Sequence, residues 1–298
     1  MPPPEAVFSE ILDRAESELR RGELVPARER LEALLAREGL PETAEFRRAV
    51  NMLGAAYFEL GMLEDAEREF ARALDLANRA GDPLTLARAT NNLGLIANIR
   101  GRHDEALTRY HLALPAYQRG GSTGGMAETC HNLAITWRDL GRLEDAERYE
   151  RRAIVYAQEV GNRRLLAMAR VGRAELCLRR GEPAVAEAGA RLGAAEYAAI
   201  PDALGQADAL RLQGAALTEL GDLAGARHAL DQAVALAREH GALLLEAEAL
   251  AARARLGAEA GERQHAREDG AQALRLFERL GAEPDRAALQ GWLAGLAP

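Results

Sequence analysis

The sequence predicts an all-α solenoid of seven consecutive helix hairpins followed by a C-terminal capping helix. A glycine recurs every 39 or 40 residues along the 298-residue chain, and an alanine follows each of these glycines five residues later. Alanine makes up about a fifth of the chain, whereas aromatic residues reach only 4%. Alanine, leucine, arginine and glutamate suit helices, and the residue types that strands favour are scarce. A fixed period of this length is typical of repeat architectures.

Two helices fit into each 40-residue unit. The turn glycines are Gly22, Gly61, Gly101, Gly141, Gly181, Gly221 and Gly261, and the alanines are Ala27, Ala66, Ala106, Ala146, Ala186, Ala226 and Ala266. A second helix-ending residue lies halfway, at Pro41, Gly81, Gly121, Gly161, Pro201, Gly241 and Gly281. Glycine tolerates left-handed backbone and proline cannot continue a helix. We therefore expect a single domain over residues 1–298, with repeats at 5–41, 42–81, 82–121, 122–161, 162–201, 202–241 and 242–281.

Small residues mark the predicted crossing of the two helices in each hairpin. They stand seven residues before a turn glycine and pair with the alanine after it: Gly54, Gly94, Ala134, Ala174 and Gly214. Helices pack closely only where both present small side chains, so a larger residue such as leucine at Ala106 should push the pair apart.

The chain ends carry apolar stripes. In the first helix the stripe is Phe8, Ile11, Leu12, Ala15 and Leu19. A last helix over residues 284–297 aligns Leu289, Trp292, Leu293 and Leu296 on one face. We expect it to cap the core of the seventh repeat, as solenoid ends require, with a dimerisation helix as the alternative.

These positions resemble the tetratricopeptide repeat. The second unit reads Asn51-Met-Leu-Gly-Ala-Ala-Tyr57 before its turn, then places Ala66, Phe70 and Ala73 on the second helix. Units three and four keep the pattern, with Leu93, Gly94, Gly101, Ala106, Tyr110 and Ala113, and with Leu133, Ala134, Trp137, Gly141, Ala146 and Ala153. The resemblance covers about residues 5–283, although units five to seven lose most aromatic positions. The period exceeds the common 34 residues, and is similar to that of kinesin light chains and bacterial Rap-type receptors and regulators.

The resemblance implies a right-handed superhelix whose first helices line a concave groove that binds a peptide or protein. Helix geometry places one stripe of each first helix in that groove. The candidate groove residues are Arg48, Asn51, Arg88, Asn91, Asn92, Asn98, His131, Asn132 and Arg138. An amide offers donors and an acceptor to an extended peptide, and kinesin light chains and Rap-type receptors are similar in having groove asparagines, at the positions of Asn91, Asn92 and Asn132, that clamp a ligand's backbone. The alternative is that these asparagines bond to neighbouring helices or to water.

Charge along the predicted groove is uneven. Arginines dominate the early units, at Arg48, Arg88 and Arg138, whereas the late units carry Asp208, Glu219, Glu248 and Glu259. We therefore expect the acidic part of a ligand to lie over units two to four, where arginine would bind carboxylates bidentately and salt would weaken the interaction.

Catalysis, metals and cofactors are not expected. All 38 basic residues are arginine, which excludes lysine chemistry. Residues 120–124, Gly-Gly-Ser-Thr-Gly, match G-x-S-x-G, but a nucleophile elbow follows a strand and here a helix precedes it. The six histidines and two cysteines show no metal-ligand spacing, and no glycine-rich loop follows a strand.

Composition also bears on location and partners. The net charge of −8 argues against nucleic-acid binding. The cysteines lack disulfide spacing, the N-terminus has no signal-peptide pattern, and no apolar run is long enough for a membrane span. We expect a cytoplasmic protein that is a monomer or a homodimer through its cap, with no nucleic-acid or membrane partner.

Three functions remain open. The first is a non-enzymatic scaffold that binds an extended peptide or protein segment in the groove. The second is a regulatory sensor for a small effector or signalling peptide. Such sensors usually adjoin a DNA-binding or nucleotidase domain, for which repeats beginning near residue 5 leave no room. The third is a structural self-assembly unit, against which a concentration-independent monomer in light scattering would count heavily.

Overall fold

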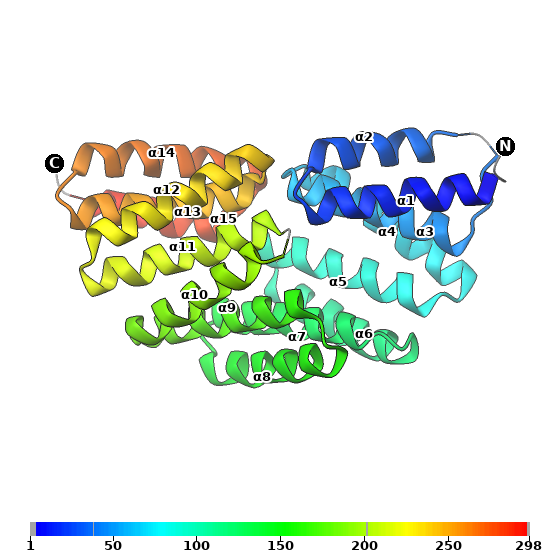
Figure 1. Ribbon diagram of the computed structural model, residues 1–298, viewed down its shortest axis with the longest axis horizontal. Coiled ribbons are helices and arrows are strands. Elements are labelled where there is room, and N and C mark those ends of the chain that lie inside the picture. The colour runs from blue at the N-terminus through cyan, green and yellow to red at the C-terminus, as the bar shows by residue number, and fades with distance from the viewer. Residues whose placement is uncertain (1–3, 38, 201, 297–298) are drawn as a thin grey trace.

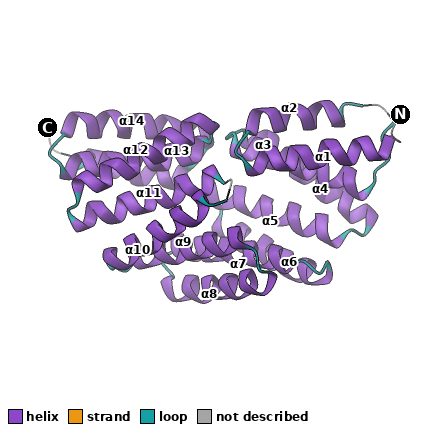
Figure 2. Ribbon diagram, viewed as in Figure 1, coloured by secondary structure: helices purple, strands orange, loops and turns teal. Residues whose placement is uncertain are grey.

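The protein is an array of helix hairpins with no strand among the residues described. The computed structural model describes residues 4–37, 39–200 and 202–296, so the predicted stop at Pro201 lies outside them. Fifteen helices occupy these ranges (Figures 1 and 2): α1 Pro4–Arg20, α2 Leu24–Leu35, α3 Ala44–Glu59, α4 Leu63–Ala80, α5 Pro83–Ile99, α6 His103–Arg119, α7 Thr123–Asp139, α8 Leu143–Val160, α9 Arg163–Arg179, α10 Pro183–Ala198, α11 Ala203–Leu220, α12 Leu223–His240, α13 Leu243–Glu259, α14 Arg263–Leu280 and α15 Glu283–Ala294. The predicted all-α solenoid is confirmed. None of these helices is both long and apolar enough to cross a membrane.

Glycines with left-handed backbone separate the helices, as predicted. All seven turn glycines and the five halfway glycines have φ between 62° and 79°. At the end of the first repeat the left-handed residue is Gly39, and Pro41 stands just before α3. Only glycine adopts this backbone without strain, so the chain reverses tightly at each point.

The helices of a hairpin approach closely where a Cβ is missing. A Cβ added at Gly94 would lie 2.7 Å from the ring of Tyr110, and one added at Gly54 would lie 2.6 Å from Phe70. Gly214 relates in the same way to Leu230, at 2.4 Å. The large side chain nine residues after the turn glycine therefore fills the space. The alanine five residues after the turn is fully buried beside it in every repeat.

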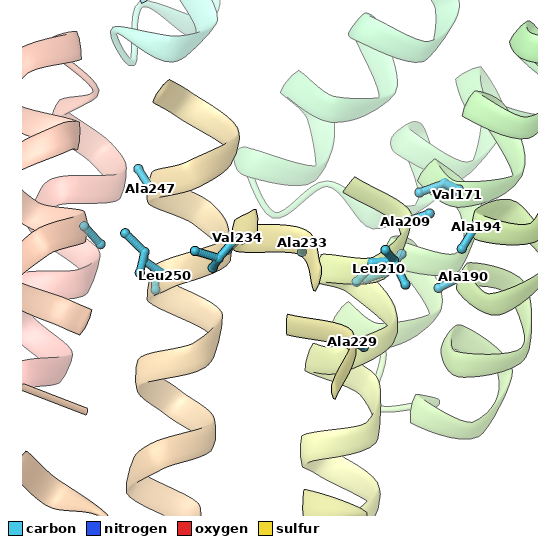
Figure 3. Close-up of a cluster of buried hydrophobic side chains, with 14 of the residues drawn as sticks. Val171, Ala190, Ala194, Ala209, Leu210, Ala229, Ala233, Val234, Ala247 and Leu250 are labelled. Carbon is cyan, nitrogen blue, oxygen red and sulfur yellow. The ribbon is translucent and has the colours of Figure 1, made fainter. Parts of the chain in front are cut away.

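The late repeats keep the same core without aromatic side chains at the crossing. Figure 3 shows this core, built mostly from alanine and leucine on α9 to α13, among them Val171, Ala194, Leu210, Ala233 and Leu250. Small side chains let these helices approach closely, so the array continues through units five to seven.

The last helix, α15, covers the end of the array. Leu289 is buried, and Trp292 and Leu293 pack against the same core as α13 and α14. A Cβ at Gly270 would lie 2.7 Å from Leu293, so α15 lies directly on α14. The predicted capping helix is confirmed, although α15 ends at Ala294 and Leu296 lies beyond it.

The first helices of the hairpins form the inner layer. First helices of neighbouring repeats contact each other along the series α1, α3, α5, α7, α9, α11 and α13. Second helices of neighbouring repeats make at most marginal contact. The array therefore curves with its first helices on the concave side, and Figure 1 shows the chain bending until the N-terminal repeats lie beside the C-terminal repeats.

This curvature brings the early turns against the late repeats. His240 Nδ1 lies 2.9 Å from the carbonyl oxygen of Gly22, 218 residues away. A Cβ at Gly61 would lie 2.8 Å from Leu280 and 3.0 Å from Leu243, and one at Gly101 would lie 2.7 Å from Pro284. We call this contact the seam. It joins repeats one to three to the last two repeats and the cap.

The close approach of α5 and α6 at Gly94 predicts that Gly94→Ala destabilises the folded protein. Overpacking against Tyr110 costs roughly 1–3 kcal/mol, while alanine in a helix gains only roughly 0.5–1 kcal/mol over glycine. The melting temperature followed by circular dichroism should fall by roughly 2–4 °C. Gly291→Ala is the matched control, because Gly291 also lies in a helix but has no neighbour within 4 Å, and it should be neutral or stabilising. A Gly94→Ala protein as stable as the Gly291→Ala protein would contradict this account.

The seam predicts a different response at two equivalent turns. Asparagine tolerates left-handed backbone, so Gly61→Asn should fold but place an amide against Leu243 and Leu280. Gly141→Asn makes the same change where no atom lies within 4 Å. Small-angle X-ray scattering should show a larger radius of gyration for Gly61→Asn only. Equal radii for both variants and the unmodified protein would show that the seam does not hold the curvature.

Candidate functional site

The predicted groove residues all lie on the first helices α3, α5 and α7, in the inner layer. They differ in how accessible they are. Asn51, Asn91 and Asn98 are buried, with exposed fractions of 7%, 4% and 8%. The others, Arg48, Arg88, Asn92, His131, Asn132 and Arg138, are half-buried. We call the inner layer of first helices the wall. The structure therefore divides the predicted set into residues buried within the wall and residues at its surface.

Asn91 joins α5 to α7. Its Oδ1 accepts hydrogen bonds from Thr129 Oγ1 at 3.0 Å and from Asn132 Nδ2 at 3.3 Å. Its Nδ2 donates to Asn92 Oδ1 at 3.4 Å, and Asn92 Nδ2 donates in turn to Asn51 Oδ1 on α3 at 3.5 Å. The asparagine amides thus form a chain of hydrogen bonds across three consecutive repeats.

Asn98 makes a second connection between α5 and α7. Its Oδ1 accepts from Thr136 Oγ1 at 2.7 Å, and its Nδ2 donates to Asp139 Oδ2 at 3.1 Å. Thr136 is fully buried. A buried amide requires such partners, which accounts for a poor helix former inside α5.

Asn92 and Asn132 retain hydrogen-bonding capacity at the surface of the wall. Asn132 donates one N–H to Asn91, and its Oδ1 accepts no hydrogen bond from the described residues. Asn132 Oδ1 is not among the buried atoms without a partner, so it reaches solvent. The amide of Asn92 uses one N–H and one lone pair of its oxygen and has one further N–H and one further lone pair. One free carbonyl and one free N–H can pair with a peptide unit.

The three early arginines differ in their pairing. Arg48 forms ion pairs with Glu16 and, at 3.9 Å, with Asp13. Arg138 lies 3.0 Å from Asp139 and 3.1 Å from Glu175. Arg88, by contrast, forms no ion pair with the residues described, although its charge acts on Glu128. Arg88 is therefore the early arginine that is free to meet an anion.

An ionic network continues along the inner layer through α9, α11 and α13. Arg211 lies 2.7 Å from Asp208, 3.2 Å from Glu175 and 3.5 Å from Glu248. Burial would raise the pKa of Glu175, but Arg138 and Arg211 outweigh it and lower the pKa to about 2. Burial raises the pKa of Glu248 to about 8, because the charge of Arg211 lowers this pKa by less than burial raises it. The late wall therefore carries an acidic group whose charge is poorly compensated.

His131 is held from behind by a carboxylate. Its Nδ1 lies 3.0 Å from Glu150 Oε1 on α8, and Glu150 is only 1% exposed. Sequence reasoning found His131 but missed Glu150. The signal was present, because Glu150 stands nine residues after Gly141, where Phe70 and Tyr110 fill the core of earlier repeats.

Two other features lie away from this wall. Ser122, in the G-x-S-x-G match, accepts a hydrogen bond from Gly125 N and caps α7, as a loop serine does before a helix. A shallow hollow between α4 and α6 is lined by Glu67, Leu74, Arg109 and neighbouring residues, mostly on second helices. Neither feature joins the candidate groove.

Comparison with known proteins places this architecture. The family model described as "Tetratricopeptide repeat" matches residues 45–119 and 85–154. The chain is 30% identical over 138 residues to the "Regulatory protein AfsR" of Streptomyces griseus, a match that covers 46% of this chain and 14% of that protein. The chain thus aligns with only about a seventh of this curated relative.

Two solved structures share the fold. The Rap conjugation gene regulator of plasmid pLS20, in complex with the Phr* peptide, superposes with a TM-score of 0.75 at 18% identity, over 92% of this chain and 74% of that one. NprR in complex with its cognate peptide NprX has a TM-score of 0.69 at 15% identity, over 92% and 80%. At these identities the likeness is one of fold.

The hydrogen bond between Asn98 and Thr136 predicts that Thr136→Val lowers the stability of the folded protein. Valine keeps the shape of threonine but removes the donor 2.7 Å from the buried Asn98 Oδ1, which then keeps only its 3.1 Å contact with His103 Nδ1. The loss of this hydrogen bond costs roughly 0.5–1.5 kcal/mol. Thermal unfolding should show the loss. Thr108→Val is the control, because the exposed Thr108 hydroxyl donates only to the carbonyl of Asp104 in its own helix. Equal melting temperatures for the two variants would argue against the inter-repeat bond.

Proposed function

Because this chain is a tetratricopeptide-repeat protein, we propose that it is a non-enzymatic scaffold that binds an extended peptide or protein segment along the inner layer of its first helices. In the proposed complex, Asn92 and Asn132 hold the backbone of the segment. The observation that supports this most directly is their unused hydrogen-bonding capacity on neighbouring first helices. The proposal treats the seven repeats as one domain.

The other predicted asparagines have a different role in this proposal. Asn51, Asn91 and Asn98 are buried and hydrogen-bonded between repeats, so they set the spacing of α3, α5 and α7. The two candidate clamps are thereby fixed relative to each other before a ligand arrives. Preorganisation of this kind reduces the entropy lost on binding.

We propose that the segment is acidic where it crosses repeats two to four. Arg88 carries this part of the proposal, because Arg48 and Arg138 already pair with carboxylates of the chain. The basic part of the segment would face Glu248, whose charged form a ligand cation would stabilise. Salt should weaken both contacts.

A regulatory sensor is the second candidate function. The match to the "Regulatory protein AfsR" favours it, as does the shared fold with Rap and NprR structures that contain peptides. In this alternative the same groove would receive a signalling peptide or a small effector. Both described cysteines are free, as in a reducing compartment, and we place either function in the cytoplasm.

The clamp can be tested with peptides selected from a random library on the immobilised protein. Asn92→Ala combined with Asn132→Ala should weaken the selected peptides by about tenfold or more, because two hydrogen bonds of roughly 0.5–1.5 kcal/mol each are lost. Isothermal titration calorimetry would measure the change.

The matched control is Asn78→Ala, which removes an exposed asparagine from α4, a second helix. It should leave the affinity unchanged. If the double variant binds the selected peptides as tightly as the control does, the groove-clamp proposal is wrong.

A further inference from the structure

A buried carboxylate stands where earlier repeats have an aromatic core residue. Glu150 on α8 is 1% exposed, and the only hydrogen bonds that its side chain forms with the described residues are to His131, at 3.0 and 3.3 Å. Burying a carboxylate without such a partner is costly. A glutamate does not fill the core as the aromatic residue of an earlier repeat does, and its carboxylate instead holds the imidazole of His131.

The backbone of the next repeat makes room for this pair. A Cβ added at Gly172 on α9 would lie 2.7 Å from His131 Cε1 and 2.8 Å from Glu150 Oε1. Any side chain at Gly172 would therefore displace both groups. The site combines three residues from three helices, α7, α8 and α9, and each is needed for the geometry.

The other imidazole nitrogen remains available. His131 Nε2 forms no hydrogen bond with the described residues and is not among their buried unpartnered atoms, so it reaches solvent. The groups whose charges act on the imidazole are Arg138 on its own helix, Glu150 on α8 and Asp208 on α11, and the imidazole in turn acts on Glu128 of its own helix. Glu128, Arg138 and Asp208 lie on first helices, so the inner layer carries most of the charged groups that interact with the imidazole.

The surrounding acidic groups are themselves paired. Asp208 lies 2.7 Å from Arg211, and Glu128 lies 3.9 Å from Arg164. Burial alone would lower the pKa of His131, but the Glu150 carboxylate outweighs this and raises the pKa above its ordinary value. Protonation of His131 therefore adds an N–H donor and a positive charge at a place where the nearby carboxylates of Asp208 and Glu128 already have arginine partners.

We propose that His131, positioned by Glu150 and Gly172, is a proton-dependent anchor for a carboxylate of the segment bound in the groove. The inference rests on the proposed function and adds a ligand group and a pH dependence to it. The protonated imidazole donates its Nε2–H to the carboxylate. Binding of that carboxylate therefore weakens as the pH rises through the pKa of His131.

The test uses hexaglutamate labelled with tetramethylrhodamine, and hexaglutamine with the same label, in fluorescence anisotropy from pH 6 to pH 8. The affinity for hexaglutamate should fall about tenfold over this range, as expected for one charge-assisted hydrogen bond. Hexaglutamine should show little change. Glu59 and Glu248, with pKa values of about 7 and 8, also titrate in this window, so the comparison with His131→Gln isolates the imidazole.

His131→Gln should abolish the additional pH dependence for hexaglutamate. Glu150→Gln should keep it but shift its midpoint to lower pH, because the imidazole loses the carboxylate that raises its pKa. A proton NMR titration of the His131 ring in the unliganded protein should show the same shift, independently of any ligand. Circular dichroism would show that each variant is folded.

Several outcomes would overturn the anchor. The proposal is wrong if the folded protein does not bind hexaglutamate at pH 6, or if His131→Gln shows the same pH dependence as the unmodified protein. It is also wrong if Glu150→Gln does not shift the midpoint, or if the affinity rises with pH, as a neutral Nε2 acceptor would produce. The proposed function fails separately, if Asn92→Ala with Asn132→Ala leaves binding of the library-selected peptides unchanged. Loss of the pH dependence alone leaves the clamp standing.

Discussion

Close approach of two helices at a missing Cβ is the constraint on which this structure depends. Gly54, Gly94 and Gly214 let the first helix of a hairpin contact a large side chain of the second. Each hairpin packs on the next one in a similar way, so that buried clusters run through several consecutive repeats. Because the crossing recurs with nearly the same spacing, small rotations between repeats accumulate in one direction. The first helices then form an inner layer and the array curves.

Curvature in turn decides what the inner layer can do. The seam between Gly61 and the pair Leu243 and Leu280 joins the second repeat to the seventh, so opposite walls face each other across the inner layer. Charges from these walls interact: Arg164 and Asp202, from the fifth and sixth repeats, act on Glu59 of the second.

Local periodicity allowed the fold to be predicted, whereas the site depends on contacts between repeats. Turn glycines such as Gly141 have left-handed φ, a local requirement that is visible in the residue type itself. The partner of Asn98 is Thr136, on the next first helix, and no local rule distinguishes an asparagine that binds a neighbour from one that binds a ligand. The contact of His240 with Gly22 spans 218 residues and arises only from the summed curvature. Glu150 was detectable in principle, as a charge in a core position.

The arginines of the inner layer make contacts with several carboxylates at once, for which lysine is less suited. Arg211 contacts Asp208, Glu175 and Glu248, which lie on three different helices, and Arg138 connects α7 to α9 through Glu175. A planar guanidinium with five donors can serve several carboxylates at once, whereas an ammonium is a point charge. Most of the basic charge predicted for the groove is therefore used to connect repeats. In the proposed complex, recognition would therefore fall to groups that the network does not neutralise, namely Arg88, the amides of Asn92 and Asn132, and the imidazole of His131.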